Sequence, residues 1–132
     1  MAVRIVRLGS KRGAGEGLRI GTVRRPPRGV PKSEFASGNW YDVWLPNLSP
    51  SAEAMKAGLT SATPGQWRAF VRRYRSEMAR PDASRVLDVL AALSHTADFS
   101  VGCYCEVESR CHRGILRELL AARGAKLAKS VP

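Results

Sequence analysis

All three cysteines of the chain and one of its two histidines lie within ten residues of one another, from Cys103 to His112. The apolar run around Cys103 predicts a short buried strand over residues 99–104. A polar turn follows it, and Cys111 then opens an apolar helix. Because α/β proteins often bind ligands where a strand leads through a loop into a helix N-terminus, this pattern predicts a site over residues 105–113.

The cysteines of this segment could supply thiolate chemistry. Cys111 is expected in the first turn of the helix, between Arg110 and Arg113, where the helix dipole and the guanidinium charges lower the pKa of a thiol. Cys105 lies at the end of the strand and is the second candidate nucleophile, whereas Cys103 fills the sheet as a small apolar residue. Arg110 stands one position short of the Cys-x5-Arg loop of protein tyrosine phosphatases, which argues against phosphatase chemistry.

His112 has two interpretations that the sequence leaves open. Its spacing from Ile115, Leu116 and Leu119 puts it on the apolar face of the helix, so it is either a neutral histidine bonded to a nearby loop or a catalytic acid–base group. A metal is not expected, because structural zinc sites favour Cys-x2-Cys pairs and because adjacent helical side chains point about 100° apart. We therefore predict no metal and no cofactor.

The charge of the chain indicates an anionic partner. It holds 22 basic and 11 acidic residues, for a net charge of +11, and 17 of the basic residues are arginine. Guanidinium groups bind phosphate and carboxylate bidentately, although a GC-rich genome would raise arginine, alanine and glycine together in the same way. Nine basic and two acidic residues fall within residues 1–40, a concentration typical of surfaces that bind phosphate.

Hydrophobic periodicity predicts alternating strands and helices. Strands are expected at 2–8, 18–23, 41–45 and 99–104, and helices at 51–57, 64–80, 82–93 and 111–123. Ser51 is a predicted helix cap, Thr63 and Gln66 form a capping box, and Asp82 is expected to cap the following helix. The glycine-rich loop 9–17 precedes a strand and not a helix, so we interpret it as a flexible connection instead of a phosphate cradle.

These elements predict one three-layer α/β domain over residues 1–125, with a small, largely parallel sheet, helices on both faces and the site at the carboxyl ends of the strands. Residues 126–132 are expected to form a flexible basic tail. No apolar run approaches the ~20 residues that span a bilayer, and the N-terminus has no signal-peptide core, so we expect a cytoplasmic protein with no membrane partner. An odd number of cysteines in that compartment predicts free thiols.

Four sequence blocks together resemble the YeaO-like family, catalogued as domain of unknown function 488. They are Arg24-x3-Arg28-Gly-Val, Ser49-Pro-Ser51, Trp67-x2-Phe-x3-Tyr74-x2-Glu77 and Cys-Tyr-Cys105-x5-Cys-His-Arg113, and the likeness extends over residues 3–124. The resemblance implies a small α/β domain without a settled activity. The chain departs from the family at Val23, where an acidic residue is usual, and at Pro26, where an aromatic residue is common.

The leading hypothesis is that the site binds a phosphate-bearing small molecule or a nucleotide, with enzymatic conversion left open. The residues expected to hold the anion are Arg24, Arg28, Ser51 and Arg113. Those expected to act in any reaction are Cys105, Cys111 and His112. The alternatives are a non-catalytic nucleic-acid-binding module and a thiol redox sensor that uses Cys105 and Cys111.

Overall fold

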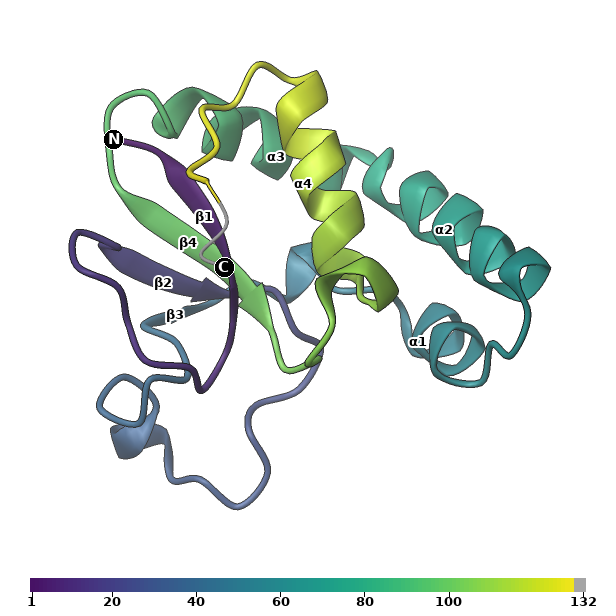
Figure 1. Ribbon diagram of the computed structural model, residues 1–132, viewed down its shortest axis with the longest axis horizontal. Coiled ribbons are helices and arrows are strands. Elements are labelled where there is room, and N and C mark those ends of the chain that lie inside the picture. The colour runs from purple at the N-terminus through teal and green to yellow at the C-terminus, as the bar shows by residue number, and fades with distance from the viewer. Residues whose placement is uncertain (130–132) are drawn as a thin grey trace.

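The computed structural model describes residues 1–129, which form a parallel sheet and four α-helices (Figure 1). The strands are Val3–Arg7 (β1), Leu18–Gly21 (β2), Val43–Trp44 (β3) and Phe99–Cys103 (β4), in the order β1-β4-β2-β3. The helices are Ala52–Leu59 (α1), Pro64–Met78 (α2), Pro81–Leu93 (α3) and His112–Ala122 (α4). The predicted α/β class with a parallel sheet is confirmed.

Strand β4 is the centre of the sheet and sets its register. It pairs with β1 from Val3 opposite Phe99 to Arg7 opposite Cys103, and on its other side with β2. Because all pairs are parallel, the carboxyl ends of β1, β2 and β4 lie at the same end of the sheet. The three segments that begin at residues 8, 22 and 104 therefore start close together.

One face of the sheet packs against the helices. Phe99 and Val101 of β4 belong to an apolar core that buried residues from all four helices join. Figure 1 shows the helices gathered on one side of the sheet, with α4 next to β1 and β4. The largest fully buried members of this core are Leu48, Tyr74, Leu87, Phe99, Leu116 and Leu120.

The opposite face of the sheet is polar and is covered by the loop 9–17. Arg19 of β2 is fully buried, and its Nε and one terminal nitrogen donate to the two carboxylate oxygens of Glu16, at 2.8 and 2.9 Å. Ser100 of β4 donates to the same carboxylate at 3.0 Å. Among residues 1–129, this loop takes the place of the second layer of helices predicted from the sequence.

Short-range signals predicted most helix ends. Ser51 caps α1 by accepting a hydrogen bond from the Ala54 amide, and Thr63 and Gln66 form the predicted capping box of α2. Asp82 does not cap α3, because that helix already begins at Pro81 and Asp82 lies within its first turn. Proline fits the first helical position since it has no amide hydrogen to satisfy there.

The chain returns to the sheet after α4. The amide of Val3 donates to the Lys126 carbonyl, and the amide of Ala128 donates to the Val3 carbonyl, both at 2.9 Å. Residues 126–128 thus extend the sheet beside β1, although they were assigned to a flexible tail from the sequence. Residues 130–132 of that predicted tail lie outside the described residues. Over the part that is described, no helix has the length and apolarity needed to cross a membrane.

Candidate functional site

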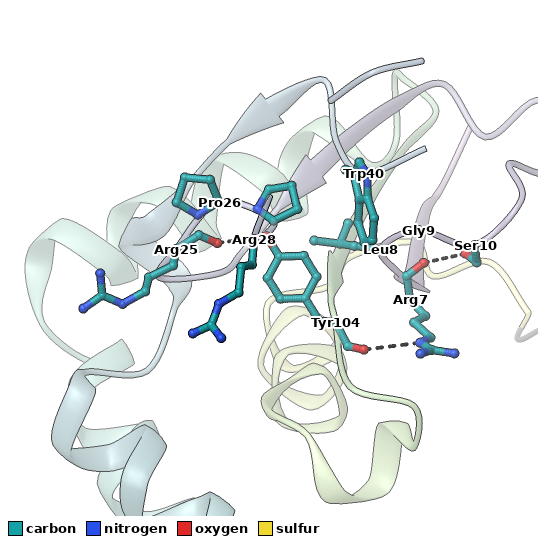
Figure 2. A pocket seen from close by; sticks show the side chains of 10 residues that line it. Arg7, Leu8, Gly9, Ser10, Arg25, Pro26, Arg28, Trp40 and Tyr104 are labelled. Atoms are coloured by element: carbon teal, nitrogen blue, oxygen red, sulfur yellow. Dashed lines mark hydrogen bonds between the residues drawn. The ribbon is translucent and has the colours of Figure 1, made fainter. Parts of the chain in front are cut away.

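A cleft of about 610 Å³ opens at the carboxyl ends of β1, β2 and β4 (Figure 2). Each strand supplies part of its wall through the segment that follows it, which is where parallel α/β sheets bind ligands. Three of the ten lining residues are arginines and none is acidic. They are Arg7, Leu8, Gly9, Ser10, Arg25, Pro26, Pro27, Arg28, Trp40 and Tyr104.

The arginine segment of the cleft is held by its backbone. The Tyr104 hydroxyl donates to the carbonyl of Arg25 at 2.8 Å, and two prolines fix the chain between Arg25 and Arg28. The side chains of both arginines are exposed, and neither has a hydrogen-bond or ion-pair partner within the described residues 1–129. Arg7 differs, because its Nε donates to the Tyr104 carbonyl at 3.2 Å and its guanidinium lies 3.7 Å from Glu106. Two positive charges therefore face the cleft unpaired.

Two aromatic rings also line the cleft. Trp40 and Tyr104 meet edge to face, with ring centroids 6.0 Å apart and an interplanar angle of 71°. Figure 2 shows the Tyr104 ring between Arg28 and Arg7. Burial raises the pKa of Tyr104, so its phenol stays protonated and keeps donating to the Arg25 carbonyl. The cleft thus combines guanidinium charge with flat apolar surface.

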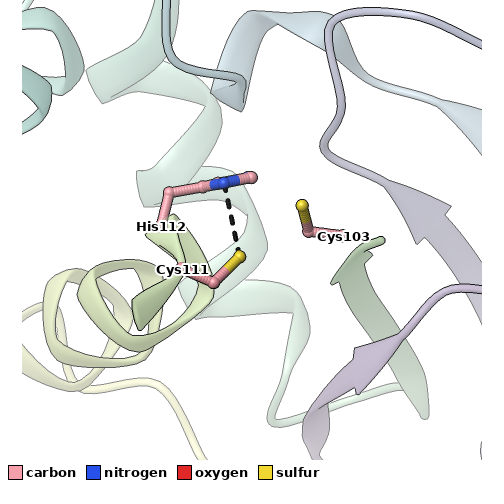
Figure 3. Close-up of side chains that lie close together, drawn as sticks. All are labelled: Cys103, Cys111 and His112. Carbon is pink, nitrogen blue, oxygen red and sulfur yellow. Dashed lines mark hydrogen bonds between the residues drawn. The ribbon is translucent and has the colours of Figure 1, made fainter. Parts of the chain in front are cut away.

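A separate cluster of thiols and imidazole lies where β4 ends and α4 begins (Figure 3). The Sγ atoms of Cys103 and Cys105 are 3.8 Å apart, and the Sγ of Cys111 is 3.7 Å from Nδ1 of His112. One ligand atom each of Cys103, Cys111 and His112 lies within 4.8 Å of the other two. All three cysteines are free thiols, and only Cys105 is partly exposed. We call these four residues the thiol cluster.

Negative charge in the thiol cluster concentrates on Cys105. Hydrogen bonds from the thiols of Cys103 and Cys111 lower the pKa of Cys105, and the charges of His112 and Arg113 add to this. The pKa of Cys103 is raised by its hydrogen bonds to the other two thiols and by burial. A hydrogen bond from Cys103 lowers the pKa of Cys111. The hydrogen bond with Cys105 and burial together raise this pKa by more, so the net shift is upward. The directions of these pKa shifts favour a thiolate on Cys105 over one on Cys111.

His112 is buried and is fixed by a hydrogen bond to the segment after β2. It is 3% exposed, and its Nε2 lies 2.8 Å from the carbonyl oxygen of Thr22, which can only accept, so Nε2 carries the proton. Burial lowers its pKa to about 4. The ring of Tyr74 packs edge-on against it at a centroid distance of 5.4 Å. This geometry agrees with the interpretation of a neutral histidine bonded to a loop.

The structure divides the residues predicted to hold an anion. Arg28 lines the cleft, whereas Arg24, although exposed, is not part of its lining. Ser51 caps α1 and hydrogen-bonds to the carboxylate of Glu77. Arg113 is 4% exposed and donates to the carbonyl of Cys105 at 2.6 Å. Ser51 and Arg113 thus hold the fold together, and neither faces the cleft.

The three residues predicted to act in a reaction share a small hollow that is distinct from the cleft. Cys105, Cys111 and His112 line a space of about 40 Å³ against α1 and α2. Trp67 and Arg110 lie at the same hollow, where the guanidinium group is 4.9 Å from the indole centroid. Of the residues predicted from the sequence, Arg28 therefore lies in the cleft and these three lie in the hollow, whereas Arg24, Ser51 and Arg113 line neither.

Only Arg28 of the ten lining residues was predicted, and the residues missed include Arg7, Arg25, Trp40 and Tyr104. Arg7 and Tyr104 lie at strand ends, so a stricter use of the strand boundaries would have found them. Arg25 is adjacent to the predicted Arg24, and only the course of the proline-fixed turn distinguishes the two. Trp40 gave no signal, since it lies in an irregular segment before β3 and not at the carboxyl end of a strand.

The fold and the cleft define a small parallel α/β protein with a basic cleft, lined in part by aromatic rings, at its strand ends and a separate thiol cluster. The family model described as the active DUF488-N3 subclade matches residues 3–124. The chain therefore belongs to the family of domain of unknown function 488, as the resemblance implied. Comparisons with curated proteins and with solved structures found no match.

Proposed function

We propose that the protein binds a phosphate-bearing small molecule of the nucleotide type in the cleft at its strand ends. The observation that carries this proposal is the pair of exposed guanidinium groups, Arg25 and Arg28, beside Trp40 and Tyr104 in a cleft without acidic residues. Arginine binds phosphate with two parallel hydrogen bonds, and aromatic rings stack on nucleobases. A volume of about 610 Å³ lies within the range of ~300–1,000 Å³ usual for small-molecule pockets.

A reaction, if the bound molecule undergoes one, is assigned to Cys105. It is the cysteine with a lowered pKa and partial exposure, and the matching family model is described as an active subclade. Cys111 and His112 line the same hollow and are the remaining catalytic candidates. The three free thiols also support the assignment to the cytoplasm, where cysteines stay reduced.

Nucleic acid is the second candidate partner, and the net charge of +11 favours it. The helix α2 adds arginines outside the cleft, among them the exposed Arg68, Arg72 and Arg75. Binding of that kind depends steeply on salt, because each phosphate contact releases counterions. The third candidate, a redox sensor, rests on the close thiols of the cluster.

Calorimetric titration with a nucleoside monophosphate, its nucleoside and inorganic phosphate tests the proposal. We expect the monophosphate to bind and Arg28→Ala to weaken it by about tenfold or more, since hydrogen bonds to charged groups contribute roughly 1.5–3 kcal/mol. Arg24→Ala is the matched control, because it removes the same charge four residues away and outside the cleft lining.

Equal affinity of the two variants would remove the cleft from the proposal. Equal affinity for nucleoside and monophosphate would remove the phosphate. Binding of a mixed-sequence oligonucleotide with a steep salt dependence, together with no measurable binding of the monophosphate, would favour the nucleic-acid module instead.

A further inference from the structure

The thiol cluster lies outside the cleft, and its side chains are types that bind metal ions. Its four side chains come from the end of β4, the bend that follows it and the start of α4. Figure 3 shows three of them, Cys103, Cys111 and His112, lying close together. Thiolate sulfur and imidazole nitrogen are the ligands that zinc prefers in proteins. The cluster offers three of the first and one of the second, the composition of a common structural zinc site.

Two of the distances between ligand atoms match tetrahedral coordination. With Zn–S bonds of about 2.3 Å and Zn–N bonds of about 2.0–2.1 Å, neighbouring ligand atoms lie about 3.8 Å apart for two sulfurs and about 3.6 Å for sulfur and nitrogen. The Sγ atoms of Cys103 and Cys105 are 3.8 Å apart, and the Sγ of Cys111 is 3.7 Å from the His112 Nδ1. One ligand atom each of Cys103, Cys111 and His112 lies within 4.8 Å of the other two, and Cys105 joins this group through its contact with Cys103.

His112 already has the orientation of a metal ligand. Its Nε2–H donates to the Thr22 carbonyl at 2.8 Å, so the lone pair of Nδ1 is free and faces the cysteines. Histidine ligands usually donate their second ring nitrogen to a carbonyl or carboxylate in this way, which fixes the tautomer and the ring. The packing of Tyr74 against the imidazole holds the ring in place.

The adjacency of Cys111 and His112, which argues against a metal on a helix, does not apply here. Cys111 is the N-cap of α4 and has extended dihedral angles, φ −135° and ψ 156°, whereas His112 is the first helical residue. The rotation of about 100° between successive side chains applies only when both residues are helical. The side chains of Cys111 and His112 can therefore point toward the same space. The change of backbone conformation between them is what brings sulfur and nitrogen together.

The surroundings of the cluster suit a site with excess negative charge. Three thiolates around a divalent ion leave one net negative charge, and the buried guanidinium of Arg113 lies next to it, bonded to the Cys105 carbonyl. The Nε–H of Arg113 has no hydrogen-bond partner within residues 1–129. The hollow lined by Cys105, Cys111 and His112 gives an ion a route to the cluster.

We propose that Cys103, Cys105, Cys111 and Nδ1 of His112 bind one zinc ion with tetrahedral geometry. The ion takes the place of the thiol protons, which pass to solvent, and no ligand changes its oxidation state. The bound ion would tie the end of β4 to the start of α4. This inference does not depend on binding in the cleft, because the cleft and the hollow beside the cluster share no lining residue. It does replace the reaction assigned above to Cys105, because a zinc-bound thiolate is not free to act as a nucleophile.

Titration of the reduced, chelator-treated protein with Co²⁺ tests the site. We expect one equivalent to produce the visible bands of tetrahedral cobalt and a thiolate charge-transfer band, both displaced by one equivalent of Zn²⁺. Cys105→Ser is the first variant, because the partial exposure of this residue makes the change tolerable. His112→Asn is the second, and both should weaken Co²⁺ binding by about tenfold or more.

His95→Gln is the matched control, since it removes the other histidine of the chain, which is exposed and bonded to the Gly124 carbonyl. Its cobalt spectrum should equal that of the wild type. Circular dichroism of each apoprotein separates loss of the site from loss of the fold. An octahedral spectrum, no spectrum, or full retention in folded Cys105→Ser would overturn the proposal, as would a disulfide among these cysteines that persists under reducing conditions.

Discussion

Strand β2 and the segment after it place arginines in two opposite environments. Arg19, on the strand, is fully buried, and its guanidinium bonds to Glu16 and to the carbonyls of Ser10 and Asn39. Arg25 and Arg28, beyond the strand end, are exposed in the cleft without a partner among residues 1–129. The same residue type therefore holds the fold in one region and is free for a ligand in the other. Net charge alone does not distinguish the two uses.

The largest effect should come from the buried arginine. Arg19→Ala leaves the carboxylate of Glu16 buried without its counter-ion, and we expect the free energy of unfolding to fall by about 3–5 kcal/mol. Urea denaturation at pH 7 measures it. Arg12→Ala is the control, because its ion pair with Asp42 is about one-quarter exposed and should contribute less. A similar loss of free energy of unfolding in the two variants would mean that burial does not set how much each arginine stabilises the fold.

Acid should weaken the buried region before it affects the cleft. The pKa of Glu16 is lowered from its ordinary value of 4.5, because burial, which raises it, is outweighed by hydrogen bonds from Arg19, Gly13 and Ser100. The stabilisation is therefore complete above pH 4.5 and is lost as the pH falls from there through the lower pKa of the folded state. Denaturation curves recorded between pH 6 and pH 3 give the free energy of unfolding at each pH. This free energy should fall less steeply with decreasing pH in Glu16→Gln than in the wild type. Equal slopes would show that Glu16 does not titrate differently on folding.

The thiol cluster divides buried from reachable groups in the same way. Cys105 is partly exposed and has the lowered pKa, whereas Cys103 and Cys111 are buried with raised pKa values. In metal-free protein at neutral pH, iodoacetamide should therefore label Cys105 at least about tenfold faster than the other two. Peptide mapping over time measures the order. Earlier labelling of Cys111 would restore the prediction based on the helix N-terminus.

The smallest effect should come from the cleft. Arg28→Ala removes an exposed side chain that has no partner among the described residues, so the free energy of unfolding should change by no more than about 0.5 kcal/mol. The same urea experiment measures it beside Arg19→Ala. A loss above about 1 kcal/mol would give Arg28 a structural role and weaken its assignment to ligand binding.

Signals that act over a few residues were sufficient to predict the helices and the succession of strands and helices along the chain. The Thr63–Gln66 capping box and the Ser51 cap follow from hydrogen bonds between residues three positions apart. The parallel α/β class follows from the alternation of strands and helices. Local patterns also placed a site at the end of the last strand, where the thiol cluster is found.

The tertiary structure decided which side chains meet. Arg7 and Tyr104 are 97 positions apart, yet the parallel register of β1 with β4 brings them to one cleft. The loop 9–17 covers the polar face of the sheet because Glu16 meets Arg19 and Ser100 there, and Ser100 is 84 positions away, so no local pattern reveals that contact.

The sequence by itself determined the elements, the class of fold and the position of the cysteines at the junction of strand and helix. It did not determine that Cys111 is extended while His112 is helical, because the start of α4 depends on its packing against the end of the sheet. Local conformational preferences extend over a single turn, whereas a cleft or a cluster is made by side chains whose distances depend on the register of the whole sheet.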